Sequence, residues 1–408
     1  MACTTMVLLL ASCASDGPKK TVRRKIKRKR SQAKVVQLEQ VTPTSLGYDL
    51  KALDDLLGDL QDTKEGTFAI MANGSLVSSH QAPTASLDAA VRLDGMSLLL
   101  WTLAVGALVD DGKLSWDTKL SALFDFTEGK PQGDITVGHV VNERTGLRRI
   151  RPHDVGDDQD VVEAMLSAPV EIKPGSRRHS YGMSMLLLPA MVEEATDGSF
   201  EDYVADRLAA PLGLQSMRIE EGRMGEPVVW ANTLDVARMG QLLARGGKAI
   251  GGERLLQLDT VQRLVRPRRG KPSSLASWRG IYPARQVALS KPGMRFLRLR
   301  GLDEEEVDEM KPLVGKFVQP EEFAPLLEDT LGEARAEEVF AWAKKHDVTL
   351  TEVERGKPIG VVLQDGRGQM LAVYPKSKTS VVRLTMKPAA VPQMLDRLST
   401  VLPARKTP

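Results

Sequence analysis

Few residues in this sequence could carry covalent or acid–base chemistry, and their spacing is informative. A serine three residues before a lysine would place an amine beside a hydroxyl on one helix face, where the amine can take the hydroxyl proton. That spacing occurs once in the chain, at Ser31 and Lys34, inside a run of basic residues. None of the histidines has a metal-binding spacing; they are His80, His139, His153, His179 and His346. The sequence therefore predicts no metal site and no cofactor.

The two cysteines, Cys3 and Cys13, lie at the start of the chain, so the rest of it holds neither a disulfide nor a cysteine metal site. Residues 6–12 form a short apolar run. The sequence Leu-Ala-Ser-Cys that ends at Cys13 resembles the bacterial lipobox, at which a signal is cut and the cysteine is lipidated. We therefore predict a lipoprotein-type signal over residues 1–13, with Cys13 as the lipidated N-terminus.

The net charge of +3 conceals a strong asymmetry. Ten basic residues and no acid lie between residues 19 and 34, so residues 1–34 carry a net charge of +9 and the remainder carries −6. Such a run stays extended, and we predict a basic tether over residues 14–45. After a lipidation site, the basic segment 19–34 favours contact with anionic lipid headgroups. The predicted location is the bacterial cell envelope, lipid-anchored on the periplasmic side of a membrane; nucleic acid is the disfavoured partner.

The composition of the chain is that of a globular protein. Its apolar content of 42%, with 34 Gly and 23 Pro, excludes wholesale disorder, collagen and coiled coil. Beyond about residue 13, no apolar run reaches the ~18 residues that a membrane-spanning helix needs. One domain over residues 46–408 is predicted.

The elements that would position any site are strands at both ends of this domain and helices between them. An Asn-Gly pair at residues 73–74, between two apolar runs of 66–80, predicts a β-hairpin. Residues 98–109 are apolar on nearly every face, which predicts a buried helix that Gly112 ends. Further helices are predicted over 135–142, 158–167, 183–195, 200–209, 233–245, 257–265 and 388–402, and strands over 360–363, 370–374 and 381–385.

Two stretches differ from this pattern. Residues 266–300 lose the periodicity, and the acidic residues that follow predict a helical insertion over 301–350. The predicted fold is α/β plus all-α: an antiparallel sheet built from both chain ends and flanked by helices, with a helical domain inserted.

The order of several segments resembles the serine β-lactamase and penicillin-binding-protein superfamily, especially its class C and esterase-like branch. The segments that carry the resemblance are 103–114, 135–147, 174–175, 186–200, 211–214, 230–238, 366–375 and 381–385. Together they extend over roughly residues 46–265 and 358–402. The resemblance implies a β-lactamase/transpeptidase-like fold and the chemistry of a serine hydrolase.

The residues that such chemistry needs are missing at the positions that the resemblance indicates. The family's serine falls on Gly95 and its lysine on Leu98. The tyrosine motif falls on Ser180, Tyr181 and Gly182, and the third motif on Gln364, Asp365 and Gly366. Only the last glycine is kept.

The leading hypothesis is a non-catalytic envelope lipoprotein that binds a cell-wall-derived ligand, such as a peptidoglycan fragment, or a protein partner. One alternative is an active serine hydrolase of β-lactamase, carboxypeptidase or esterase type, which uses Ser97, Tyr181 and His179 as displaced groups. A second alternative is a nucleic-acid-binding protein that acts through its basic N-terminal arm.

Overall fold

The computed structural model describes most of the chain from residue 37 onward. The described residues are 37–62, 66–151, 154–156, 159–176, 182–223, 225–267, 277–281, 287–298, 303–318, 320–346, 348–353 and 358–385, with 394, 395, 398 and 401. The predicted signal, Cys13, the basic segment 19–34 and most of the helix predicted over 388–402 lie outside them. Within the described ranges, no helix combines the length and the apolar character needed to cross a membrane.

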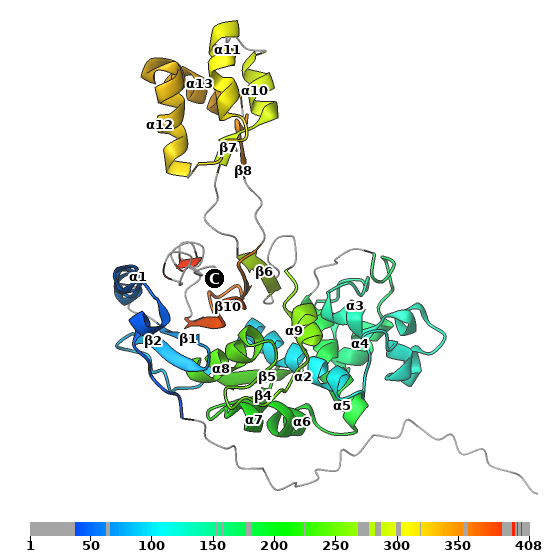
Figure 1. Cartoon of the computed structure of the whole chain (residues 1–408). Coiled ribbons are helices and arrows are strands. Elements are labelled where there is room, and N and C mark those ends of the chain that lie inside the picture. The colour runs from blue at the N-terminus through cyan, green and yellow to red at the C-terminus, as the bar shows by residue number, and fades with distance from the viewer. Residues whose placement is uncertain are drawn as a thin grey trace, which may run out of the picture. The chain divides into compact units, whose positions relative to one another are not determined.

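A six-stranded antiparallel sheet forms the centre of the fold, in the order β2-β1-β11-β10-β9-β6 (Figure 1). The strands are β1 (Thr67–Ala72), β2 (Ser75–Gln81), β6 (Ser277–Ile281), β9 (Gly360–Gln364), β10 (Met370–Tyr374) and β11 (Thr379–Leu384). The prediction of an antiparallel sheet from both chain ends is therefore confirmed. Strand β6 lies in the stretch without periodicity and was not predicted. Its five residues of mixed polarity give too weak a pattern to detect.

The sheet is covered on both faces. In β10, Leu371 and Val373 belong to the hydrophobic cluster that contains α2, while Ala372 and Tyr374 belong to a second cluster. Successive side chains of a strand point to opposite faces, so this alternation means that each face packs against its own layer. The second cluster includes residues of α1 (Leu50–Asp62).

The predicted hairpin is confirmed. Asn73 and Gly74 join β1 to β2 with φ angles of 48° and 97°. Both residues have positive φ, the conformation that suits the right-handed twist of the flanking strands and that Asn and Gly adopt most readily.

Most of the predicted helices are present in the body, with ends that differ by a few residues. They are α2 (Leu98–Asp110), α3 (Val137–Val141), α4 (Val161–Ser167), α5 (Leu187–Thr196), α6 (Phe200–Val204), α8 (Thr233–Ala244) and α9 (Leu258–Leu264). The short helix α7 (Ala210–Leu212) was not predicted. A small sheet in the order β3-β5-β4 accompanies them; it consists of β3 (Val91–Arg92), β4 (Arg218–Glu221) and β5 (Pro227–Ala231).

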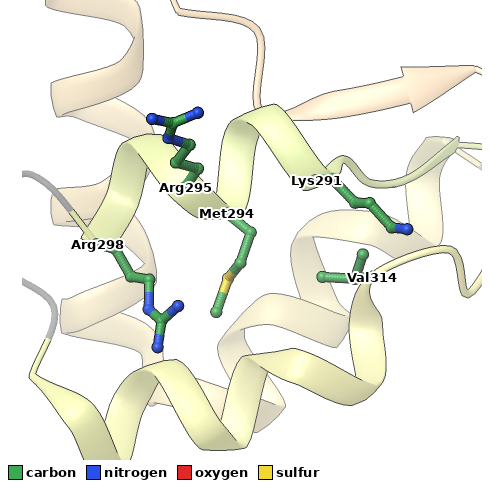
Figure 2. A pocket seen from close by; sticks show the side chains of 5 residues that line it. All are labelled: Lys291, Met294, Arg295, Arg298 and Val314. Atoms are coloured by element: carbon green, nitrogen blue, oxygen red, sulfur yellow. The ribbon is translucent and has the colours of Figure 1, made fainter.

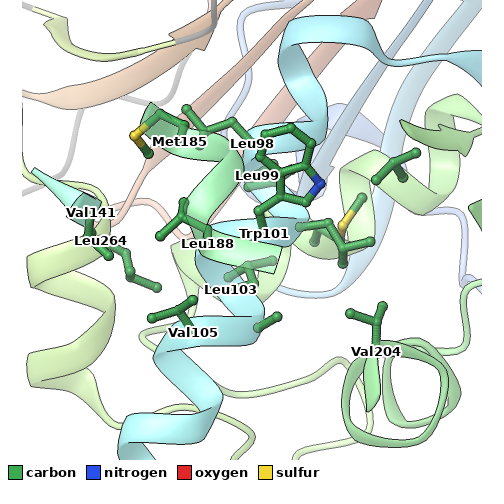
Figure 3. Close-up of a cluster of buried hydrophobic side chains, with 14 of the residues drawn as sticks. Leu98, Leu99, Trp101, Leu103, Val105, Val141, Met185, Leu188, Val204 and Leu264 are labelled. Carbon is green, nitrogen blue, oxygen red and sulfur yellow. The ribbon is translucent and has the colours of Figure 1, made fainter. Parts of the chain in front are cut away.

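Helix α2 is the centre of the larger hydrophobic cluster. Its residues 98–108 are all buried, and their side chains meet those of neighbouring helices, among them Val141, Leu188 and Leu264 (Figure 3). The indole of Trp101 donates a hydrogen bond to the carbonyl of Pro227 at 3.0 Å, which ties α2 to β5. Gly112, with φ at 71°, follows the end of the helix. The prediction of a helix buried on every face is confirmed.

Residues 287–353, here called the inserted segment, form a cluster of their own. The elements are β7 (Val287–Leu289), α10 (Lys291–Arg298), α11 (Glu304–Met310), α12 (Pro320–Leu331), α13 (Glu333–Lys345) and β8 (Thr351–Val353). The buried hydrophobic residues of this cluster all lie between Leu289 and Leu350. The elements begin before and end after the range 301–350, and they include the strand pair β7-β8.

Candidate active site

The first turn of α2 is where the resemblance indicates a serine and a lysine. A 3-10 turn, Asp94–Ser97, leads directly into α2. Gly95 is buried in this turn and offers no side chain that could react. Leu98 is 3% exposed and belongs to the main hydrophobic cluster. An ionised amine at this position would lie in apolar surroundings, where an unpaired charge is costly.

Ser97 is the hydroxyl nearest to these positions in the sequence, and its oxygen is already engaged. The Ser97 side chain accepts a hydrogen bond from the backbone N–H of Val229 at 3.0 Å. The residue is 1% exposed, so its hydroxyl is closed to solvent. This hydrogen bond links the start of α2 to β5.

Asp94, immediately before Gly95, is the centre of a charged network. Its two carboxylate oxygens pair with the guanidinium groups of Arg92 and Arg367, each at 2.7 Å. The Asp94 backbone has a φ of 40°, a region that side chains other than Gly enter rarely. Strain of this kind persists when surrounding contacts fix the residue, and the two arginines supply such contacts.

The third-motif positions lie at the turn that joins β9 to β10. Gln364 accepts a hydrogen bond from Arg279 of β6 at 2.7 Å. One oxygen of Asp365 accepts the backbone N–H groups of Arg367 and Gln369, at 2.9 and 3.0 Å. Gly366 stands beside open space. Through Arg367 and Asp94 the structure brings the third-motif turn and the start of α2 together.

Three buried polar atoms around this turn have no hydrogen-bond partner among the described residues. They are the second carboxylate oxygen of Asp365, the carbonyl oxygen of the Gln369 side chain and Nε of Arg279. The Gln369 amide nitrogen, in contrast, donates to the carbonyl of Arg92 at 2.9 Å. Buried polar atoms are nearly always paired, so each of these three has capacity for a water molecule or a ligand.

Burial raises the pKa of the Asp365 carboxyl, and the negative charge of Asp94 adds to the effect. The two backbone N–H donors and the charge of Arg367 act in the opposite direction. A carboxyl whose charged form is disfavoured can serve as a hydrogen-bond donor when it holds its proton. The turn can therefore present both donors and acceptors to a polar ligand.

The tyrosine-motif positions cannot be placed in this network. His179, Ser180 and Tyr181 lie outside the described residues, whereas Gly182 begins the 3-10 turn that precedes α5. Of the three displaced groups that an active hydrolase would use, the structure thus places only Ser97.

The sequence reasoning missed the charged residues that dominate the site. Arg92, Asp94, Arg279 and Arg367 each lie close to a motif position or on a neighbouring strand. Asp94 directly precedes the missing serine, and Arg367 follows the surviving Gly366. Their positions beside the motifs could have marked Asp94 and Arg367 as candidate site residues. Nothing in the sequence, however, indicates that these two residues form an ion pair.

Comparisons with known proteins concern the family and the fold. A family model described as Beta-lactamase matches residues 53–402. No curated protein matches the sequence.

Solved structures share the fold at low sequence identity. A Bacteroides dorei protein assigned as a beta-lactamase superposes with a TM-score of 0.58 at 16% identity, covering 87% of this chain and 99% of that one. A beta-lactamase/D-alanine carboxypeptidase from Pseudomonas syringae gives 0.54 at 14% identity, with 88% and 98% covered. A class C beta-lactamase from Rhodobacter sphaeroides gives 0.52 at 14%, with 86% and 97% covered.

The sheet from both chain ends, the buried central helix and the family model over residues 53–402 lead to one conclusion. The chain belongs to the beta-lactamase family.

Proposed function

We propose that this chain is a non-catalytic member of the beta-lactamase family that binds a cell-wall-derived ligand or a protein partner at the turn between β9 and β10. It acts in the bacterial envelope, anchored by a lipid on Cys13 and assisted by the basic segment 19–34.

The observation that carries the proposal is the chemistry at the start of α2. A serine hydrolase of this family needs a hydroxyl and an amine one helical turn apart. Here those positions hold Gly95 and the buried Leu98, and the neighbouring Ser97 hydroxyl is closed to solvent and engaged with β5.

Retained binding is supported by the unsatisfied polar atoms. Asp365, Gln369 and Arg279 together offer two acceptors and one donor that no described residue uses. A ligand rich in amides, carboxylates and hydroxyls, as peptidoglycan fragments are, would reach these atoms once the turn opens, because each of them is closed to solvent in this structure. The desolvation that these atoms have already undergone makes a matching ligand favourable.

An active serine hydrolase is the second candidate. Structures that share the fold carry the names of beta-lactamases and of a carboxypeptidase. In this version Ser97 would attack the substrate, with Tyr181 or His179 taking the proton.

Covalent labelling separates the two candidates. The full-length protein is incubated with a fluorescent penicillin and with a fluorophosphonate probe, beside the variants Ser97→Ala and Tyr181→Phe. The expected result is no labelling of any of the three proteins. Labelling that Ser97→Ala abolishes would overturn the proposal, provided that thermal unfolding of Ser97→Ala beside wild type shows that this variant is folded.

Anchoring is tested separately from catalysis. Wild type should sediment with membranes and Cys13→Ser should not. A wild-type protein found in the soluble fraction would contradict the envelope assignment without affecting the argument about Ser97.

A further inference from the structure

An open pocket of about 360 Å³ lies against α10 in the inserted segment. It is lined by Lys291, Met294, Arg295, Arg298 and Val314. Figure 2 shows Met294 and Arg298 extending toward the same space beneath the helix, while Lys291 reaches past Val314 at the other end. Arg295 completes the lining from the opposite side of α10 in this view.

The helix that carries these side chains is held firmly. Ser290 caps it by accepting the backbone N–H of Gly293 at 2.9 Å, and the same hydroxyl donates to the carbonyl of Leu350. A Cβ added to Gly293 would stand 2.3 Å from that carbonyl, so α10 approaches the chain before β8 too closely for any larger residue. The backbone of α10, which carries Lys291, Arg295 and Arg298, is therefore fixed in position.

Lys291, Arg295 and Arg298 are exposed, and among the described residues none of them has an ion-pair partner. Acids are abundant nearby, since residues 287–353 hold fifteen acidic and nine basic residues. Other cations of the segment do pair: Lys311 with Asp308, and Arg335 with Glu306 and Glu338. The cations along α10 are thus left free in a segment that could have neutralised them.

Part of this arrangement is unfavourable. Like charges on one short helix repel one another, and Lys291 lies at the N-terminal end, where the helix dipole disfavours a cation; Arg295 and Arg298 lie in the last turn, where the dipole favours them. A bound anion would reduce the repulsion and offset the penalty at Lys291. Arginine guanidinium groups match the oxygens of phosphate in pairs, and lysine adds a mobile charge.

We propose that this pocket binds a phosphorylated ligand, with its phosphate on the Arg298 guanidinium and an adjoining apolar group on Met294 and Val314. Lys291 and Arg295 add positive charge from the other end and the other side of α10. The site is separate from the turn between β9 and β10, so it stands or falls independently of the proposed function. A free phosphomonoester and the phosphodiester of a lipid headgroup both present anionic phosphate oxygens, and the experiment distinguishes them.

The experiment uses the full-length protein and two triple variants. One is Lys291→Gln/Arg295→Gln/Arg298→Gln. The control, Lys316→Gln/Lys344→Gln/Lys345→Gln, removes the same charge from other exposed positions of the inserted segment. Calorimetry measures binding of glycerol 3-phosphate, and cosedimentation measures binding to phosphatidylglycerol vesicles against phosphatidylcholine vesicles. The basic segment 19–34 is present in all three proteins, so its contribution to vesicle binding cancels.

The α10 variant should bind at least about tenfold more weakly than wild type, and the control within about twofold. Loss confined to glycerol 3-phosphate identifies a soluble ligand, and loss confined to the vesicles identifies a lipid headgroup. Absence of binding to both probes by wild type, or equal loss in the two variants, would overturn the proposal. The ring of Trp342 lies 4.8 Å from that of Phe296 in α10, in a tilted arrangement. Near-ultraviolet circular dichroism that matches wild type therefore indicates that the helix stays in place.

Discussion

Two charged regions of this chain differ in what their charges face. At the start of α2, Asp94 is held between Arg92 and Arg367, so the charges there satisfy one another. Along α10, Lys291, Arg295 and Arg298 face no acid among the described residues. A paired charge contributes modestly to the stability of the fold. An unpaired charge beside a pocket can bind a ligand of opposite charge.

The largest effect should come from forcing a charge into the first region. Leu98→Lys would restore the residue type that the resemblance indicates at a position only 3% exposed. We expect a loss of about 3–5 kcal/mol in the free energy of unfolding, because the ammonium would be buried without a partner. Urea denaturation measures it.

Leu98→Met is the matched control, since it keeps the volume and should cost less than about 1.5 kcal/mol. If Leu98→Lys proved as stable as Leu98→Met, the start of α2 would be more open than its burial indicates, and the contrast between the two regions would break down.

A smaller effect should separate paired from unpaired arginines. Arg367→Gln removes the ion pair with the Asp94 carboxylate, which is 17% exposed, and should cost about 0.5–1 kcal/mol. Arg298→Gln removes a guanidinium without a described partner and should stay within about 0.5 kcal/mol of wild type. Thermal unfolding of both variants at low and high salt tests the difference, and equal losses would contradict it.

The smallest effect concerns pH at Asp365. Because burial raises the pKa of this carboxyl, the folded protein binds the proton more tightly than the unfolded chain does. The carboxyl is neutral in both states below its ordinary pKa of 3.8, and the folded state loses stability as pH rises from there through the raised value.

Asp365→Asn keeps an oxygen for the two backbone donors and cannot ionise. It should be slightly more stable than wild type at pH 7, with the gain vanishing near pH 3. A gain that grew as the pH fell would mean that the pKa is shifted in the opposite direction. Urea titrations at several pH values provide the measurement.

Much of the fold followed from local patterns. The helix of α2 is apolar on every face, and Asn73-Gly74 has the backbone freedom that a tight hairpin needs. Both features act within a few residues, so a single sequence displays them. The ordered segments then led to the family, and with it to the position of Gly95 and Leu98.

The charged network could not be predicted because it depends on distance in space. Asp94 and Arg367 are 273 residues apart in the chain, and each would pass for an ordinary surface charge. Strand β6 contributes Arg279, yet its five residues carry no periodicity. Likewise, helix α10 was not expected, because residues 266–300 show no helical periodicity in the sequence. This helix carries Lys291, Arg295 and Arg298.

The pairing of β1 with β11 has a consequence for how the chain is made. Thr67 lies opposite Leu384, so β1 must wait for a partner that leaves the ribosome more than 300 residues later. At about 5–20 residues per second, that interval is roughly 15–60 s. Throughout it, the hairpin of β1 and β2 exposes an apolar strand edge of the kind that other nascent chains can join. Assembly of the sheet is thus a late event of biosynthesis, and the helices between its two halves have time to fold first.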